Sequence, residues 1–192
     1  MNTQSLFILS GPSGAGEDSI INALSKRLPV ERVVTTTTRD PRPGETQGNP
    51  YYFVSRATFD AMIATDSLAE WAEEYNGNLY GVTREELIRV SSSDKIGIWK
   101  IEWKGVLTAK RMFPGIISIL ISAPLESIEA RIRKRDNLSE AYLAERMEYT
   151  REWMTHTDIY DYTIENRDGE LEKAVDQAEA IIRRHSELPE RS

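Results

Sequence analysis

With 192 residues, 40% of them hydrophobic, the chain is long enough to bury one substantial core, and its net charge of -7 argues against general attraction to nucleic acid or an anionic membrane. The sequence has no cysteine and only two histidines, which excludes disulfides and thiolate nucleophiles and argues against a histidine metal centre. It has neither an apolar run long enough to cross a bilayer nor a signal-peptide pattern, so we expect a soluble cytoplasmic protein, either a monomer or a homodimer.

The first predicted elements are a buried strand, a glycine-rich turn and a helix. Residues 6–9 are apolar, the turn follows at residues 11–16, and helical spacing runs over residues 18–27. Such a turn lets backbone amides approach an anion, and the start of the helix adds partial positive charge. The stretch is almost a P-loop, G-x-x-x-x-G-K-[ST], but Glu17 and Asp18 stand where lysine and a hydroxyl residue belong.

A small α/β insertion is predicted next. Aromatic-rich segments between residues 51 and 81 alternate with turn residues, which indicates a small antiparallel sheet. Residues 56–64 have helical spacing, and Thr83 with Glu86 predicts a capping box at the start of a further helix.

The chain then returns to alternating strands and helices. Buried-strand patterns recur at residues 96–101, 116–121 and 160–164, and helical spacing lies between them and again over residues 170–185. Ser139 can cap one of these helices. The alternation favours an α/β fold in which a mostly parallel core sheet carries helices on both faces.

Several sequence blocks, taken together and in order, are similar to guanylate kinases: residues 11–16, 37–45, 51–55, 70–73, 80–81 and 160–166. The resemblance covers essentially the whole chain and implies the P-loop nucleoside monophosphate kinase fold. It implies a core at about residues 1–34, 95–124 and 150–192, a GMP-binding insertion at about 35–94 and a lid at about 125–149. The implied reaction converts ATP and GMP, or dGMP, into ADP and GDP, or dGDP, with Mg²⁺.

The resemblance also assigns residues to GMP. Arginine forks match phosphate oxygens, and tyrosine hydroxyls add oriented donors. A carboxylate can accept hydrogen bonds from the N1–H and N2–H edge of guanine, which adenine does not offer. The implied phosphate clamp is Arg39, Arg42, Tyr51 and Tyr80, and the implied base contacts are Glu70, Glu102 and the hydroxyl of Thr35 or Thr36.

ATP is expected to bind on the glycine-rich turn, while the lid supplies positive charge. Arginines that arrive when a lid closes suit phosphoryl transfer, which needs mainly alignment and charge stabilisation. The implied phosphate-binding residues are Gly11, Ser13, Gly14, Ala15, Gly16, Glu17, Asp18 and Ser19. The implied catalytic arginines are Arg131, Arg135 and Arg146, and Asn166 matches a residue near the adenine.

The charge at the P-loop is reversed relative to the family, and a second departure offers compensation. Lys100 ends a core strand where the family usually has an acid, so the charges at positions 17 and 100 are exchanged. We hypothesise that Lys100 either pairs with Glu17 or takes over the phosphate contact of the missing lysine. Asp18 would then help to hold Mg²⁺, directly or through water.

Two other functions remain open at this point. A guanylate-kinase-like domain can serve as a catalytically silent binding module, and the altered P-loop fits a site that drifted after catalysis was lost. The pair Asp18 and Ser19, together with residues 80–82, also resembles ribose 1,5-bisphosphate phosphokinases. Retention of Arg42, Tyr51 and Glu70 argues for a nucleotide substrate instead.

Overall fold

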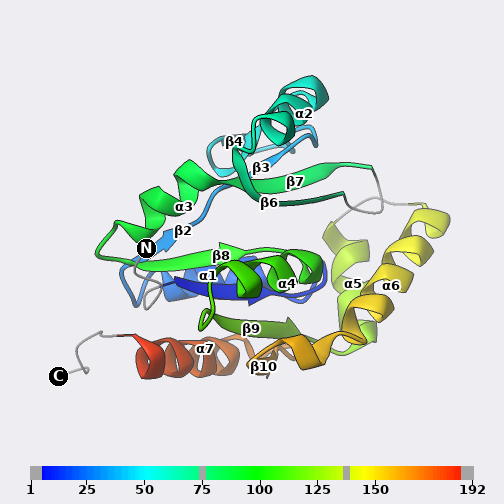
Figure 1. Cartoon of the computed structure of the whole chain (residues 1–192). Helices are drawn as coiled ribbons and strands as arrows, with labels where there is room; N and C mark the ends of the chain where they lie inside the picture. The colour runs from blue at the N-terminus through cyan, green and yellow to red at the C-terminus, as the bar shows by residue number, and fades with distance from the viewer. Residues whose placement is uncertain (1–5, 74–76, 136–138, 187–192) are drawn as a thin grey trace.

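The core of the protein is a five-stranded parallel sheet, seen in a computed structural model that describes residues 6–73, 77–135 and 139–186 (Figure 1). The strand order is β10-β9-β1-β8-β2, and every neighbouring pair is parallel. The predicted parallel sheet is therefore confirmed. Its strands are β1 (Leu6–Ser10), β2 (Val30–Arg32), β8 (Ile96–Lys100), β9 (Ile117–Ser122) and β10 (Tyr162–Glu165).

Helices cover both faces of this sheet, as the sequence predicts. Successive side chains of a strand point to opposite faces. Leu6 and Ile8 pack in the cluster that contains α4 (Trp103–Met112), whereas Phe7 and Leu9 pack in the cluster that contains α1 (Glu17–Leu24) and α7 (Leu171–His185). Helix α1 ends at Leu24, three residues earlier than the apolar spacing predicts.

The second sheet is mixed, so the antiparallel prediction was wrong. Its strand order is β4-β5-β3-β7-β6, in which β3 pairs parallel with β5 and antiparallel with β7. In Figure 1 it lies above the core sheet, with α2 on its outer side. The strands are β3 (Thr35–Thr37), β4 (Thr46–Gln47), β5 (Pro50–Phe53), β6 (Leu68–Glu73) and β7 (Leu79–Thr83), and α2 is Arg56–Ala64.

A β-bulge in β6 turns one acidic side chain away from α2. The register shifts between Leu68 and Glu70, so Ala69 is an extra residue relative to β7. Leu68 consequently packs with Phe59 of α2, whereas Glu70, two residues later, faces the opposite side of the sheet. Without the bulge, period-two alternation would place both side chains on one face.

The remaining helices are α3 (Arg84–Ser91), α5 (Leu125–Arg135), α6 (Glu140–Met154) and the 3₁₀ turn η2 (Thr157–Ile159). The Thr83 hydroxyl accepts a hydrogen bond from the Glu86 amide, but Glu86 does not complete the capping box, because its carboxylate accepts from the Val34 amide and from Arg89. The predicted Ser139 cap is confirmed, since its hydroxyl accepts from the Tyr142 amide. In the described ranges, every helix is too short or too polar for a bilayer span.

Candidate active site

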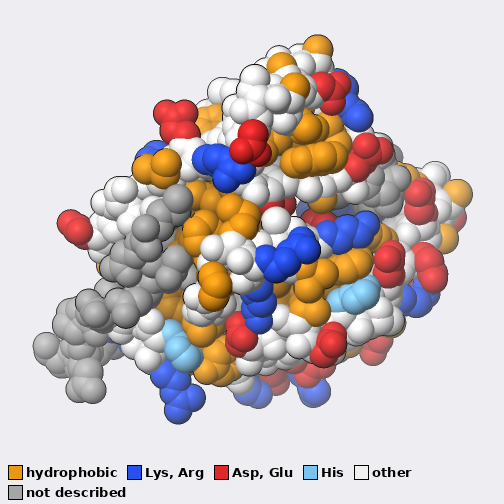
Figure 2. Space-filling model, viewed as in Figure 1, with side chains coloured by type: hydrophobic (Ala, Val, Ile, Leu, Met, Phe, Trp, Pro, Cys, Tyr) orange, Lys and Arg blue, Asp and Glu red, His pale blue; other side chains and the backbone are white. Residues whose placement is uncertain are grey.

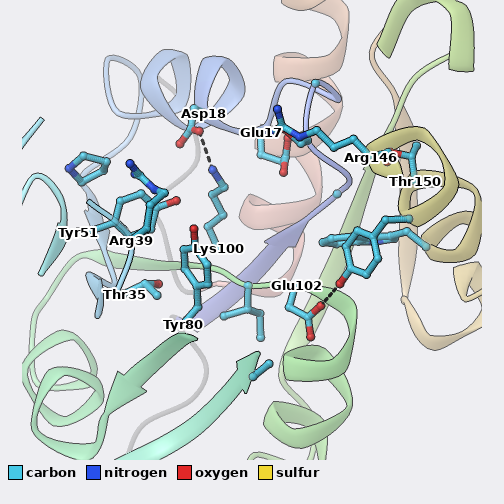
Figure 3. Close-up of a pocket in the computed structure, with 18 of the residues that line it drawn as sticks. Glu17, Asp18, Thr35, Arg39, Tyr51, Tyr80, Lys100, Glu102, Arg146 and Thr150 are labelled. Carbon is cyan, nitrogen blue, oxygen red and sulfur yellow. Dashed lines mark hydrogen bonds and ion pairs between the residues drawn. The ribbon is translucent and has the colours of Figure 1, made fainter. Parts of the chain in front are cut away.

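A cavity of about 220 Å³ lies where the core sheet, the smaller sheet and α6 meet (Figure 3). Most of the residues predicted to bind GMP and phosphate line it, although they come from distant parts of the sequence. They are Gly11, Ser13, Gly14, Glu17, Asp18, Thr35, Arg39, Arg42, Tyr51, Glu70, Tyr80, Lys100, Glu102, Arg135 and Arg146.

A separate, shallow hollow lies over α4, where basic side chains gather in Figure 2. It shares no residue with the cavity, and its lining residues are Lys104, Leu107, Thr108, Lys110 and Arg111.

Two glycines let the loop between β1 and α1 fold close to its neighbours. A Cβ atom on Gly11 would lie 2.3 Å from the carbonyl oxygen of Ile121. Gly16 has a φ of 103°, and a Cβ there would lie 2.3 Å from Asn166 Nδ2. A side chain at position 11 would push the loop off the sheet, and one at position 16 would be strained by the positive φ and would displace the Asn166 side chain. Either change would disturb the loop amides that can bind phosphate.

The Glu17 side chain is buried at the start of α1, and its Oε2 accepts a hydrogen bond of 3.1 Å from the Gly16 amide. Burial raises the pKa of Glu17 to about 7, although the nearby charge of Lys100 acts in the opposite direction. Close to neutral pH the carboxyl group is therefore only partly ionised. The repulsion that the sequence suggests at this position is correspondingly weaker.

Lys100 pairs with Asp18 and not with Glu17, which corrects one of the two predicted arrangements. Its Nζ donates to Asp18 Oδ2 at 2.6 Å, drawn as a dashed line in Figure 3, and Arg32 donates to Oδ1 at 2.6 Å. Burial opposes ionisation of Asp18, but these two cations lower its pKa to about 2. Burial lowers the pKa of Lys100, whereas Tyr51, Asp18 and Glu17 raise it. The net result is a pKa above the usual range of a lysine. Both side chains of the pair are therefore charged at neutral pH.

The arrangement does not fit a resident magnesium ion. Both oxygens of Asp18 are engaged by cations, which leaves no carboxylate oxygen there for Mg²⁺. Over residues 6–73, 77–135 and 139–186, no group of three histidine, aspartate or glutamate side chains could hold a metal. The prediction that Asp18 holds Mg²⁺ does not agree with these contacts.

Two of the three predicted catalytic arginines reach the loop from the helices beside it. Arg135 and Arg146 both donate to Ser13 Oγ, at 3.0 Å and 2.9 Å. Their helices, α5 and α6, pack together through a small apolar cluster that holds both guanidinium groups at the cavity. A phosphate beside Ser13 would therefore meet two positive charges.

Arg131, the third arginine, lies behind the loop and does not line the cavity. It donates to the carbonyl oxygens of Gly14 and Ala15 and pairs with Asp168 at 2.7 Å. Asn166 donates to the same Ala15 oxygen at 2.8 Å. These contacts make Arg131 a support of the loop in this conformation. Among the predicted phosphate-binding residues, three also lie outside the cavity lining: Ala15, Gly16 and Ser19.

On the opposite side of the cavity, Glu45 fixes the orientation of Arg39. The guanidinium donates to both Glu45 oxygens, at 3.0 Å and 2.8 Å, and lies 5.4 Å from the centre of the Tyr51 ring. Glu45 Oε2 also accepts from the Arg42 amide at 2.8 Å, which fixes the loop that carries both predicted phosphate-binding arginines. The sequence indicates the arginines but does not predict that Glu45 orients them.

Glu70 and Glu102 face the far end of the cavity and differ in their surroundings. Glu102 accepts from the Lys104 amide at 3.1 Å, as the N-cap of α4, and from the Tyr149 hydroxyl. Glu70 is 7% exposed, and burial, aided by the charge of Glu102, raises its pKa to about 8. A buried carboxyl with so strongly raised a pKa marks a candidate binding position, and once ionised it can accept hydrogen bonds from a ligand that offers donors.

Of the two predicted threonines, only Thr35 lines the cavity. Thr36 is the next residue on β3, so its side chain points to the other face of the sheet. Its predicted contact with the base is therefore not supported.

Comparisons with known proteins show the family of this chain. The family described as guanylate kinase matches residues 3–185. The chain belongs to the guanylate kinase family. Guanylate kinase of Methylococcus capsulatus is 37% identical over 92% of this chain and 86% of its own length, and that of Carboxydothermus hydrogenoformans is 35% identical over 100% and 93%. The crystal structure of guanylate kinase from Anaplasma phagocytophilum has a TM-score of 0.76 at 28% identity, covering 95% of this chain and 86% of that one.

Gly105 of this guanylate kinase family member offers a test of how tightly Glu70 is held. A Cβ at position 105 would lie 3.0 Å from Glu70 Oε2 and 3.3 Å from Ile101 Cβ. We expect Gly105→Ala to raise the KM for GMP by roughly 3- to 10-fold, because Glu70 would have to shift by only a fraction of the ~1 Å displacement that can cost about 100-fold. The KM for ATP should not change, and steady-state kinetics with each substrate varied in turn would check both. An equal rise in both values would contradict a local effect on Glu70.

Proposed function

We propose that this protein transfers the γ-phosphoryl group of ATP to GMP or dGMP, producing ADP and GDP or dGDP. The observation that carries the proposal is the position of Lys100. Lys100 lines the P-loop cavity, and its Nζ lies 2.6 Å from Oδ2 of Asp18, the residue that stands where the family has a hydroxyl side chain. Positive charge missing from the loop is thus supplied by β8.

In the proposed complex, GMP occupies the half of the cavity beside the smaller sheet. Arg39, already oriented by Glu45, and Arg42 bind its phosphate, together with the hydroxyls of Tyr51 and Tyr80. Glu70, as a carboxylate, accepts from guanine N1–H and N2–H. Adenine presents an acceptor at N1, so AMP would leave this carboxylate unpaired.

ATP would place its phosphates on the loop amides, where Lys100, Arg135 and Arg146 surround the group in transfer. A phosphate oxygen of GMP attacks the γ-phosphorus, a new P–O bond forms, and the bond from the γ-phosphorus to the bridging oxygen of ADP breaks. The three cations stabilise the charge on the transferred group and on the leaving ADP. Lys100 leaves Asp18 to take this role.

Magnesium is proposed to enter with ATP, as part of the substrate. The reason is that Lys100 and Arg32 already occupy both carboxylate oxygens of Asp18.

We also propose that residues 35–94 act as the GMP-binding insertion and residues 125–149 as the lid. Two features support the lid: α5 and α6 pack on each other, and both carry an arginine that reaches Ser13.

The two rival functions have less support. A sugar bisphosphate offers only hydroxyl donors and lacks the planar pair of N–H donors with which guanine matches a carboxylate such as Glu70. A silent module would not need Lys100, Arg135 and Arg146 gathered at the loop. A coupled assay with ATP, Mg²⁺ and GMP, dGMP, AMP or ribose 1,5-bisphosphate tests the proposal. Turnover is expected with GMP and dGMP only, whereas GMP binding without turnover would indicate a silent module.

A further inference from the structure

Asp18 has two cationic partners, and only one of them lines the cavity. Lys100 binds Oδ2 and faces the cavity, whereas Arg32 binds Oδ1 from β2, outside the cavity lining. The two strands are neighbours: Arg32 pairs in register with Ile98, two residues before Lys100. Each oxygen of the carboxylate therefore has its own cation, held by adjacent strands of a rigid sheet.

The proposed function requires Lys100 to leave Asp18 when the donor phosphates arrive. An unpaired Asp18 would then stand beside an incoming polyanion, and the two like charges would repel each other. It would also compete with the phosphates for Lys100. A second cation that stays on Asp18 removes both difficulties, because it neutralises the carboxylate at each stage.

We propose that Arg32 is a positioning residue of the donor site, which balances the negative charge of Asp18 while Lys100 moves from Asp18 to the phosphates of ATP. The proposal rests on the proposed function of Lys100 and assigns Arg32 no contact with substrate. Its geometry suits the task, since the side chain is 30% exposed and Asp18 lies 2.6 Å away. Arg32 acts entirely through Asp18, so its importance depends on the charge of that residue.

This dependence gives the test. ATP binding to the full chain would be measured by titration calorimetry, for the parent and for Arg32→Gln, Arg32→Lys, Asp18→Asn and the Arg32→Gln/Asp18→Asn pair. Arg32→Gln should weaken ATP binding by roughly tenfold, because one uncompensated charge is left near the phosphates. Asp18→Asn should bind ATP at least as well as the parent, and the double variant should match Asp18→Asn. Arg32→Lys should restore most of the affinity.

A merely structural ion pair between β2 and α1 predicts a different pattern. Arg32→Gln and Asp18→Asn would then lower the melting temperature equally and leave ATP affinity unchanged, which would overturn the proposal. So would an Asp18→Asn variant that loses affinity only when Mg²⁺ is present, since Asp18 would then be a metal ligand. Arg27→Gln is the matched control, because Arg27, which follows α1, is also ion-paired, with Glu172 and Asp176 of α7, and is 25% exposed.

Binding and turnover separate the two levels of inference. If the parent binds ATP but transfers no phosphate to GMP, the proposed function fails, and the affinities of the variants still test Arg32. If turnover is normal and Arg32→Gln binds ATP like the parent, the proposal for Arg32 fails alone.

Discussion

Replacing Lys100 by methionine is expected to lower kcat/KM for ATP by roughly 100- to 1000-fold, the usual loss when one group that stabilises transition-state charge is removed. Methionine keeps much of the length of the side chain but removes the charge that balances Asp18 and Glu17 at the cavity. The KM for GMP should change little, because the clamp around Arg39 is separate. Steady-state kinetics with each substrate varied in turn would measure both effects.

Lys110 provides the control for this variant. It is also an ion-paired lysine, 2.9 Å from Asp161 and 30% exposed against 26% for Lys100, but it lies outside the cavity. Lys110→Met should therefore leave kcat/KM unchanged. The reciprocal pair Glu17→Lys with Lys100→Glu restores the usual family distribution of charge and should recover turnover that Lys100→Glu alone has lost. Normal turnover by Lys100→Met would refute the role of β8 in the donor site.

Changing Glu70 to glutamine is expected to have opposite effects on catalysis and on stability. The glutamine amide cannot accept both guanine donors, so kcat/KM for GMP should fall at least about 100-fold. The unliganded protein should nevertheless become more stable at pH 8, by about 1–3 kcal/mol, because a buried carboxyl with a raised pKa is destabilising once it ionises. Glu73→Gln, on the same strand but exposed, is the control for both measurements.

The pH dependence of Glu70 follows from the same shift. Its pKa is about 8 in the folded protein, against 4.5 for a glutamate side chain free in water. Between these values the folded state holds more protons than the unfolded state, so the free energy of unfolding contributed by this group falls as pH rises. GMP binding requires the carboxylate, so affinity for GMP should rise roughly tenfold from pH 6.5 to 8, above the second ionisation of the phosphate near pH 6. A flat profile in calorimetric titrations would contradict this assignment, and Glu70→Gln should remove the slope.

The core fold could be predicted from the sequence because its signals are local. Uninterrupted apolar segments mark strands that are buried on both faces, and the glycines before α1 mark the turn. The pairing of strands in the smaller sheet could not be predicted, since the parallel pairing of β3 with β5 depends on contacts that no short segment encodes.

The site residues divide in the same way. Arginines and acids inside recognisable motifs, such as Arg39 and Glu70, could be assigned, and both line the cavity. Arg32 stands in a three-residue strand without a motif, and only the pairing of β2 with β8 brings it to Asp18. The choice between Thr35 and Thr36 needed the orientation of one strand, which period-two alternation decides only after one face is known.

The bulge at Ala69 also decides which changes of length β6 can tolerate. Removing Ala69 would make Leu68 and Glu70 neighbours in a regular strand, so the two side chains would still face opposite sides of the sheet and Glu70 would stay at the base-binding end of the cavity. One extra residue between Leu68 and Glu70 would also remove the need for a bulge, since residues three apart face opposite sides of a regular strand. Homologues that keep guanine as their substrate should therefore have either a bulge at this point or one residue more or fewer between this leucine and this acid.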